Sequence, residues 1–377
     1  MRKPRAVILT GHFPVQKRQG NILWLSDNLR ANGWHVSMIT VGYSWVSKLR
    51  GDRRFEQLEG GAPVAGETRH DDSLTSFFAF SPLHPFSVRK PLLDALLHPL
   101  HQSFPWYWSG KLPRYLDGAD LVVLESGPPV MLAPQVRRAA PDAAFVYRVS
   151  DDIHVHGVPR FLARAEMAHA PLFDRISVAS RFLARRFAHL DSLRIDPMGV
   201  AKSFLDGDLP DPFAADRSGR YQAVCAGTTQ FDADSINMMA ALRPDWTFHV
   251  LGRLKTVLPD APPNLILHGE VPFSTAAAYV KYADAGLAPY LDKPGAEYQT
   301  EQSNRMLMYR YFGLPMIGPH RICDPEVPRL VGYAPGSRDS MAAALGQLGG
   351  MRRGPSDPAV QDWSVLYERI VSTPKPA

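Results

Sequence analysis

The sequence has no apolar run near the roughly 20 residues that a helix needs to cross a bilayer. Its only cysteines are Cys225 and Cys323, so a disulfide framework is excluded, and neither has the spacing of a zinc motif. Residues 1–5 lead directly into a strand-like segment, without the apolar stretch or the cleavage site of a signal peptide. We therefore expect a protein of the reducing cytoplasm.

Common nucleotide and metal motifs are also missing. Neither GxGxxG nor the P-loop pattern GxxxxGK occurs, which disfavours a dinucleotide oxidoreductase and a P-loop NTPase. His154 and His156 have no third metal ligand nearby. No DxD pair lies in a loop suited to a metal-bound sugar nucleotide, because Asp208 and Asp211 lie in the predicted linker and Asp232 with Asp234 begins a predicted helix. We expect no required metal and no cofactor.

The composition is that of a globular protein with a mild positive charge. Apolar residues make up 45% and charged residues 21% of the 377 residues, a length that favours two domains. The net charge of +5 fits an anionic membrane surface or an anionic substrate, and we expect no nucleic-acid partner.

Strand-like and helix-like segments alternate along both halves of the chain. The strands expected in the first half are residues 6–10, 35–41, 121–124, 144–148, 176–179 and 193–195, with helices at 21–31, at 128–138 and after a capping Ser180. The second half has strands at 222–226, 247–251, 264–267, 286–289 and 315–317, and helices at 232–242, 274–282 and 303–312. This alternation predicts an α/β protein with two Rossmann-like domains of doubly wound parallel sheets. The polar stretch 201–220 is the expected linker, so we place the domains at 1–202 and 203–352.

The segment 76–108 breaks this pattern, because aromatic and leucine side chains dominate it and basic residues lie among them. Such a mixture suits a membrane interface, where rings lie at headgroup level and cations meet anionic lipid. A core-packing helix with a buried aromatic loop fits the same residues, so both interpretations stay open. The membrane hypothesis assigns contact to Phe86, Arg89, Lys90, Trp106 and Trp108.

Ligands of open α/β sheets bind beyond the carboxyl ends of the strands. Asp151 directly follows the strand 144–148, where a carboxylate can take a proton from a hydroxyl. Asp152 is its competitor, and a helix-capping role is the structural alternative for either. Further strand ends in the first half carry His12, Glu125 and Arg148.

In the second half, Arg305 falls in the first turn of a predicted helix, after Ser303 and Asn304. A helix amino terminus with a guanidinium makes an anion site suited to a diphosphate, although an exposed surface arginine fits the sequence as well. Glu270 follows Gly269 and can accept hydrogen bonds from ribose hydroxyls or a base edge.

Short motifs occur in a fixed order along the chain. They are YSWVSKLRGD (43–52), HPF (84–86), ESG (125–127), VYRVSD (146–151), FHVLG (248–252), GE (269–270), GLAPY (286–290), FGLP (312–315) and GYAPG (332–336). Each motif is weak alone, but the ordered set is specific. From about residue 6 to 350 the chain resembles the xanthan-type glucuronosyltransferases, glycosyltransferase family 70.

The resemblance implies a GT-B fold with two Rossmann-like domains facing a central cleft, and a carboxy-terminal segment (353–377) that returns to the first domain. It implies an inverting, metal-independent transfer of glucuronic acid from UDP-glucuronate in exopolysaccharide synthesis. The family's acceptor is the terminal mannose of a polyprenyl-diphosphate-linked oligosaccharide, so a peripheral enzyme on the cytoplasmic face of the inner membrane is expected. The family's catalytic base corresponds to Asp151, and we place His12, Glu125 and Arg148 on the acceptor side.

The resemblance also places the donor site, with departures. Glu270 and Tyr290 match positions that contact the nucleotide, whereas the family's Met-Lys pair and later Gln correspond to Asn304, Arg305 and Met308. The expected donor-binding residues are Thr229, Glu270, Val271, Tyr290, Ser303, Asn304 and Arg305. The departures leave the donor sugar open, and either Arg305 or Arg148 can meet a uronate carboxylate.

Three rival functions remain from the sequence. The same fold can use another UDP-hexose, or the chain can be a UDP-sugar 2-epimerase, which would need no lipid-facing segment. A non-catalytic membrane-bound scaffold is the third, and it would tolerate loss of Asp151.

Overall fold

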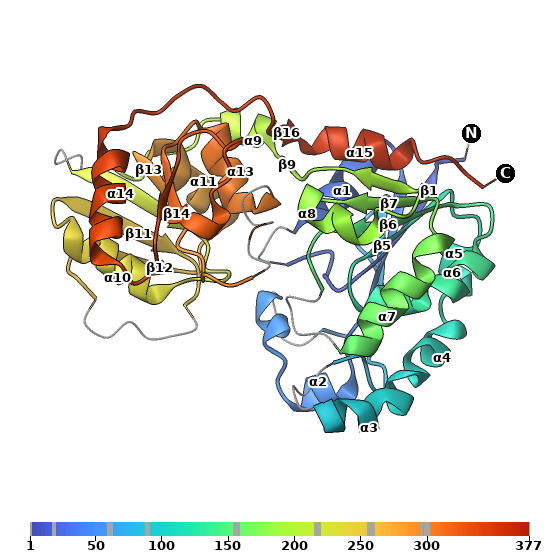
Figure 1. The fold of residues 1–377 in the computed structure, drawn as a ribbon. Coiled ribbons are helices and arrows are strands. Elements are labelled where there is room, and N and C mark those ends of the chain that lie inside the picture. Colours follow the sequence, from blue (N-terminus) through green and yellow to red (C-terminus); the bar gives the residue numbers. More distant parts are fainter. Residues whose placement is uncertain are drawn as a thin grey trace. The chain divides into compact units, whose positions relative to one another are not determined.

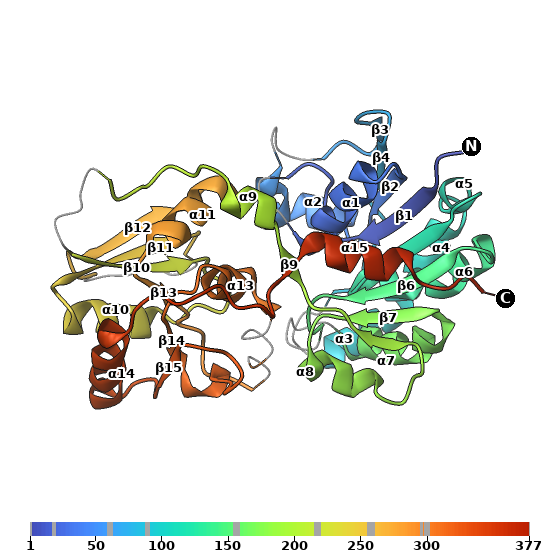
Figure 2. The same ribbon diagram turned by 90° about the horizontal axis from the view of Figure 1, so that it is seen from above.

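The computed structural model describes residues 2–16, 20–58, 63–86, 91–153, 159–214, 220–254, 261–294, 297 and 302–376. The chain forms two compact units, Met1–Met198 with Trp363–Ala377, and Gly199–Asp362. Compared with the boundaries expected from the sequence, the second unit takes in residues 199–202 and 353–362. Figure 1 and Figure 2 show the elements of each unit.

The first unit is built on an eight-stranded sheet in the order β3-β4-β2-β1-β5-β6-β7-β8. Its strands are β1 (Arg5–Thr10), β2 (His35–Thr40), β3 (Gly66–Arg69), β4 (Leu74–Phe78), β5 (Leu121–Glu125), β6 (Ala144–Val149), β7 (Arg175–Val178) and β8 (Leu193–Ile195). All neighbours pair in parallel except the edge strand β3, which runs antiparallel to β4. The central strands are buried along their whole length, as expected of a parallel sheet covered on both faces.

Helices on both sides of the strands complete the first unit. They are α1 (Asn21–Ala31), α2 (Trp45–Leu49), α3 (Pro91–His101), α4 (Ser103–Ser109), α5 (Pro113–Leu116), α6 (Ala133–Ala139), α7 (Arg160–His169), α8 (Arg181–Ala184) and α15 (Trp363–Val371), with 3-10 helices η1 (Arg53–Gln57), η2 (Pro128–Leu132), η3 (Ala170–Leu172) and η4 (Arg185–Phe187). The carboxy-terminal α15 packs on α1, where the Trp24 and Trp363 rings stack at 6.4 Å.

The second unit has a six-stranded, all-parallel sheet in the order β12-β11-β10-β13-β14-β15. Its strands are β10 (Tyr221–Ala226), β11 (Trp246–Leu251), β12 (Leu265–Gly269), β13 (Ala285–Leu287), β14 (Met316–Pro319) and β15 (Leu330–Tyr333), and a short ladder pairs β9 (Gly199–Val200) with β16 (Gln361–Asp362). The helices are α9 (Lys202–Asp206), α10 (Ala233–Leu242), α11 (Phe273–Tyr282), α13 (Asn304–Tyr311), α14 (Arg338–Gly350) and the 3-10 helix η5 (His320–Ile322).

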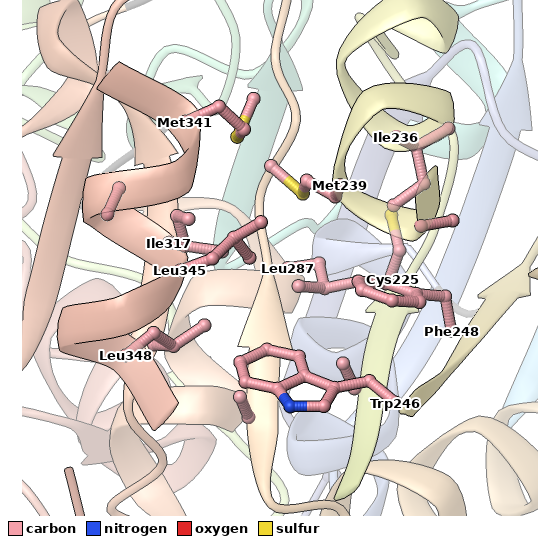
Figure 3. Close-up of a cluster of buried hydrophobic side chains, with 14 of the residues drawn as sticks. Cys225, Ile236, Met239, Trp246, Phe248, Leu287, Ile317, Met341, Leu345 and Leu348 are labelled. Atoms are coloured by element: carbon pink, nitrogen blue, oxygen red, sulfur yellow. The ribbon is translucent and has the colours of Figure 1, made fainter. Parts of the chain in front are cut away.

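The core on one face of this sheet lies between the strands and the helices α10 and α14. Figure 3 shows Trp246 and Phe248 of β11 beside Cys225 of β10, with Leu345 and Leu348 of α14 opposite. Each of these side chains is almost completely buried. Burying a large apolar side chain stabilises a fold by about 1.5–3 kcal/mol, so this layer holds the strands in place.

The α/β class expected from the sequence is confirmed, and so are most of its elements. Two expectations were wrong in detail. Residues 128–132 form a 3-10 turn before α6 rather than one continuous helix, and the expected linker 201–220 contains the helix α9. The alternation also gave no sign of the β3–β4 hairpin.

The aromatic segment 76–108 has both buried side chains, as a core-packing segment would, and exposed ones, as a membrane interface would. Trp108 is completely buried, with its ring packed against Phe77 and Phe104, so the assignment of Trp108 to membrane contact is wrong. Trp106 is 77% exposed, whereas Phe86 is half-buried against the rings of neighbouring histidines. Arg89 and Lys90 lie outside the described residues. Among the described helices, none is both long and apolar enough to cross a bilayer.

Candidate functional site

A row of polar side chains crosses the sheet of the first unit at the carboxyl ends of its strands. Glu125 of β5 is the register partner of Arg148 of β6, which is the partner of Ser177 of β7. Thr10 of β1 extends the row, because its hydroxyl donates a hydrogen bond to Glu125. Four adjacent strands therefore each contribute one polar group to the edge where α/β proteins bind ligands.

Arg148 lies in the middle of this row and is almost completely buried. Its Nη1 donates to Ser177 Oγ at 2.9 Å and to the Asp196 carbonyl oxygen at 2.7 Å. Nε and Nη2 have no partner in the described structure. Burial lowers the pKa of the guanidinium to about 10, against the opposing charges of Asp196 and Glu125. Arg148 therefore remains a cation at neutral pH, with hydrogen-bonding capacity to spare.

His12 and Glu125 form the other end of the row. His12 Nε2 lies 3.8 Å from Glu125 Oε1, and the backbone N–H of His12 donates to Thr10 Oγ1 at 3.0 Å. Glu125 is buried, whereas the His12 side chain is partly open to solvent. His12, Glu125 and Arg148, which the sequence assigned to one side of the reaction, thus come from one edge of one sheet.

The structure separates the two competing aspartates after β6. Asp152 is buried, and its Oδ1 forms an ion pair with Arg186 Nη2 at 2.6 Å. Asp151 is exposed, and its carboxylate has no hydrogen bond or ion pair within the part of the chain that the structure describes. Asp152 is therefore a structural residue, while Asp151 is the carboxylate that an incoming hydroxyl can reach.

Three glycine loops lie side by side at the corresponding edge of the second unit. Gly227, Gly252 and Gly269 follow or end the adjacent strands β10, β11 and β12. The Gly252 N–H donates to the Gly269 carbonyl oxygen at 2.6 Å, which joins two of the loops. Gly227 and Gly252 have φ angles of +114° and +124°, a conformation that other residues rarely adopt. No side chain of their own therefore covers the backbone at these two positions.

Arg305 points into these loops from the first turn of α13 and is almost completely buried. Its Nη2 donates to the Gly227 carbonyl oxygen, and its guanidinium carbon lies 4.6 Å from the centre of the Tyr290 ring. Nε and Nη1 have no partner in the described structure. The alternative of an exposed surface arginine is therefore wrong, because this cation is built into the site.

Ser303 and Tyr290 fix the start of α13. The Tyr290 hydroxyl bonds to Ser303 Oγ at 2.8 Å, and Ser303 Oγ accepts the Met306 N–H at 3.2 Å as a helix cap. A capped helix start with a buried arginine concentrates positive charge at one point. The remaining predicted donor residues follow strands of the same sheet or begin α13, with Val271 half-buried and Thr229, Glu270 and Asn304 exposed.

The sequence did not reveal the partners that hold these groups. Arg148 depends on Ser177 and on the backbone of Asp196, whose carboxylate is held in turn by Arg175 at 2.6 and 2.9 Å. No local pattern marks such partners, because they are tens of residues away in the chain and meet only through strand pairing. Within the described residues no group of three His, Cys, Asp or Glu side chains is arranged to hold a metal, and His154 and His156 lie outside them.

The contrast between the two aspartates predicts that their substitutions differ in their effect on stability. Asp152→Asn should lower the free energy of unfolding by about 1–3 kcal/mol, because it removes the charge that Arg186 is paired with. Asp151→Asn should change it by less than about 0.5 kcal/mol, because that exposed side chain has no hydrogen bond or ion pair to lose in the described structure. Urea denaturation followed by circular dichroism measures both. Equal destabilisation by the two variants would contradict the assignment of their roles.

Comparisons with known proteins agree with the fold and with the family resemblance. Residues 8–179 match the family model described as the N-terminal domain of the glucuronosyltransferase GumK. A curated relative from Xanthomonas campestris pv. campestris is named UDP-glucuronate:glycolipid 2-beta-glucuronosyltransferase. It is 29% identical over 354 residues, which cover 92% of this chain and 84% of the relative.

Solved structures with the same fold are more distant in sequence. The α,α-trehalose 6-phosphate synthase of Burkholderia multivorans has a TM-score of 0.64, with 11% identity over 98% of this chain and 96% of that one. HepE from Anabaena, solved with UDP and glucose, has a TM-score of 0.61, with 11% identity over 98% and 99% of the two chains. At these identities the likeness shows the GT-B fold alone. Residues 8–179 thus match the family model of the GumK N-terminal domain, and the chain has the GT-B fold and is similar to the xanthan-type glucuronosyltransferases.

Proposed function

We propose that this protein transfers glucuronic acid from UDP-glucuronate to the mannose of a polyprenyl-diphosphate-linked oligosaccharide, with inversion and without a metal, during exopolysaccharide synthesis. The observation that carries the proposal is the exposed carboxylate of Asp151 at the carboxyl end of β6, which has no hydrogen bond or ion pair among the described residues. The similarity to a glucuronosyltransferase that acts on a glycolipid supports the choice of donor and acceptor.

Asp151 is the general base of the proposed reaction. Its carboxylate takes the proton of the acceptor hydroxyl as that oxygen forms a bond to the anomeric carbon of the sugar. The bond from this carbon to the diphosphate breaks on the opposite face, so the configuration inverts and UDP leaves with the electron pair. Asp151 can do this because its oxygens form no ion pair within the described part of the chain, in contrast to Oδ1 of Asp152.

Arg305 and the start of α13 stabilise the departing diphosphate. A buried guanidinium with two N–H directions unfilled is costly until an anion binds, and a diphosphate supplies several acceptor oxygens. The N–H groups of the first helical turn add a further positive potential. This arrangement favours binding of UDP-sugar and stabilises the negative charge that develops on UDP.

The exposed face of α3 and α4 is the proposed membrane contact. Leu92 and Leu96 are 83% and 73% exposed, and with Leu100 they repeat every four residues along one side of α3. Trp106 of α4 adds an exposed ring. Apolar side chains of this number rarely face water without function, and a lipid-linked acceptor requires the enzyme to work at a bilayer. We place the enzyme peripherally on the cytoplasmic face of the inner membrane, against anionic lipid.

Transfer from radiolabelled UDP-glucuronate to lipid extract containing the mannosylated polyprenyl-diphosphate acceptor tests the reaction. Label should reach the lipid from UDP-glucuronate and not from UDP-glucose, and Asp151→Asn should lower kcat by about 10²–10⁴-fold because the base is lost. Transfer from UDP-glucose alone would overturn the donor. Turnover of UDP-sugar without lipid would favour the epimerase, and full activity of Asp151→Asn would remove this residue from the mechanism.

Arg305→Met should weaken UDP binding by about 10- to 100-fold, because a charge-assisted hydrogen bond contributes about 1.5–3 kcal/mol. Isothermal titration calorimetry with UDP measures the change. Arg243→Met is the control, since Arg243 is a partly buried arginine of the same unit but precedes β11, at the amino-terminal edge of the sheet. Equal affinity of Arg305→Met and the unaltered protein would contradict a diphosphate site at Arg305.

Leu96→Glu combined with Trp106→Ala should reduce binding to vesicles of anionic phospholipid at least about tenfold, because two apolar groups no longer enter the interface. Cosedimentation with the vesicles measures this. Val64→Glu is the control, because Val64 is equally exposed in the first unit but lies outside α3 and α4. Loss of binding in the control alone would place the membrane contact elsewhere.

A further inference from the structure

The position of Asp151 must be fixed by its neighbours, because no side chain holds its carboxylate in the described structure. The chain leaves the last residue of β6 at Val149 and reaches Asp151 two residues later. Side chains on both sides of this short turn are anchored in the protein. Tyr147 precedes it within β6, and Asp152 follows it directly.

A chain of hydrogen bonds joins these two anchors. The Tyr147 hydroxyl donates to Glu166 Oε1 at 2.6 Å, and Arg186 Nη1 pairs with Glu166 Oε2 at 3.0 Å. Arg186 Nη2 then pairs with Asp152 Oδ1 at 2.6 Å. Tyr147, Glu166 and Asp152 are all buried. Burial raises the pKa of Tyr147 well above its ordinary value, so the phenol stays protonated and its O–H donates a hydrogen bond to Glu166.

Arg186 is the element that connects the ends of this chain. It lies in the 3-10 helix η4 and pairs with Glu166 of α7 and with Asp152 in the turn after β6, while Tyr147 of β6 joins the network through Glu166. The planar fork of an arginine can pair with two carboxylates at once, which a lysine does less well. Without Arg186, the buried carboxylates of Asp152 and Glu166 would each lose an ion pair, and the repulsion between them would favour a turn of Asp152 towards solvent.

We propose that Arg186 is the positioning residue of the catalytic base: it holds the turn 150–152 in the conformation that presents Asp151 to the acceptor hydroxyl. The inference rests on the proposed function of Asp151 but concerns a residue that touches neither substrate. Removing Arg186 leaves the Asp151 carboxylate intact and misplaces it. A misplacement of about 1 Å can lower the rate of a chemical step by about 10²-fold.

A purely structural ion pair is the competing explanation, and the first unit contains a matched example. Arg137 Nη2 pairs with Asp174 Oδ1 at 2.6 Å, and the side chains of Arg137 and Arg186 are both 20% exposed. Asp174 precedes β7, so this pair lies at the amino-terminal edge of the sheet, away from Asp151. Arg137→Met should therefore cost similar stability without changing catalysis.

The test compares Arg186→Met, Arg186→Lys, Arg137→Met and Asp151→Asn as full-length proteins in the lipid transfer assay. We expect Arg186→Met to lower kcat by about 10²-fold with KM for UDP-glucuronate unchanged, and Arg186→Lys to recover part of the loss. Arg137→Met should keep the kcat of the unaltered protein. A folded Arg186→Met with unaltered kcat, or an equal loss of kcat in Arg137→Met, would overturn the proposal. If Arg186→Met does not fold, Tyr147→Phe cuts the same network by one hydroxyl and should lower kcat in the same direction; an unaltered kcat in that variant would also overturn the proposal.

Amide hydrogen exchange distinguishes failure of this inference from failure of the proposed function. Exchange in the peptide that contains residues 149–153 should become faster in Arg186→Met and stay unchanged in Arg137→Met, whichever sugar is transferred. Faster exchange with an inactive Asp151→Asn supports both ideas. Faster exchange with a fully active Asp151→Asn would support the positioning role of Arg186 but exclude Asp151 as the base. Unchanged exchange would reject the positioning role of Arg186.

Discussion

A guanidinium group that leaves water keeps its charge and needs acceptors around it to offset the loss of hydration. Each unit of this protein buries one such group at the carboxyl edge of its sheet, Arg148 in the first and Arg305 in the second. Both are anchored through one nitrogen to backbone carbonyl oxygens and keep two nitrogens without a partner in the described structure. These two desolvated cations dominate the electrostatic potential of each edge. The anionic and polar groups around them supply the acceptors that a buried guanidinium needs.

The parallel sheets explain how such groups are brought together. Carboxyl ends of parallel strands meet at one edge, so Glu125, Arg148 and Ser177 lie in one row although they are far apart in sequence. Large buried side chains such as Trp246 and Phe248 keep the strands of the second sheet in register (Figure 3). The edges can then carry glycines with positive φ angles and buried charge, because the packed layers beneath them supply the stability.

Much of this architecture could be predicted from the sequence, because it is locally encoded. Asp232, Ser180 and Ser303 cap the helices that their positions indicated, and the apolar runs became buried parallel strands. The burial of Trp108 could not be predicted, since aromatic side chains at a membrane surface and in a core have the same composition. The same limit applies to Asp151 and Asp152. They are adjacent in sequence, but Arg186, more than thirty positions away, pairs with Asp152 and not with Asp151.

In the proposed donor site, the arginine at position 305 also constrains how the donor is held. A lysine at this point would present a single ammonium, which can rotate towards whichever acceptor is nearest. The guanidinium instead uses Nη2 on the Gly227 carbonyl oxygen and lies against the Tyr290 ring, so its plane is fixed before a ligand arrives. Its remaining N–H groups then point in set directions, and only an anion with oxygens in those directions gains from them. A site of this kind selects by geometry, and a diphosphate held by two N–H groups leaves the sugar oriented by the same contacts.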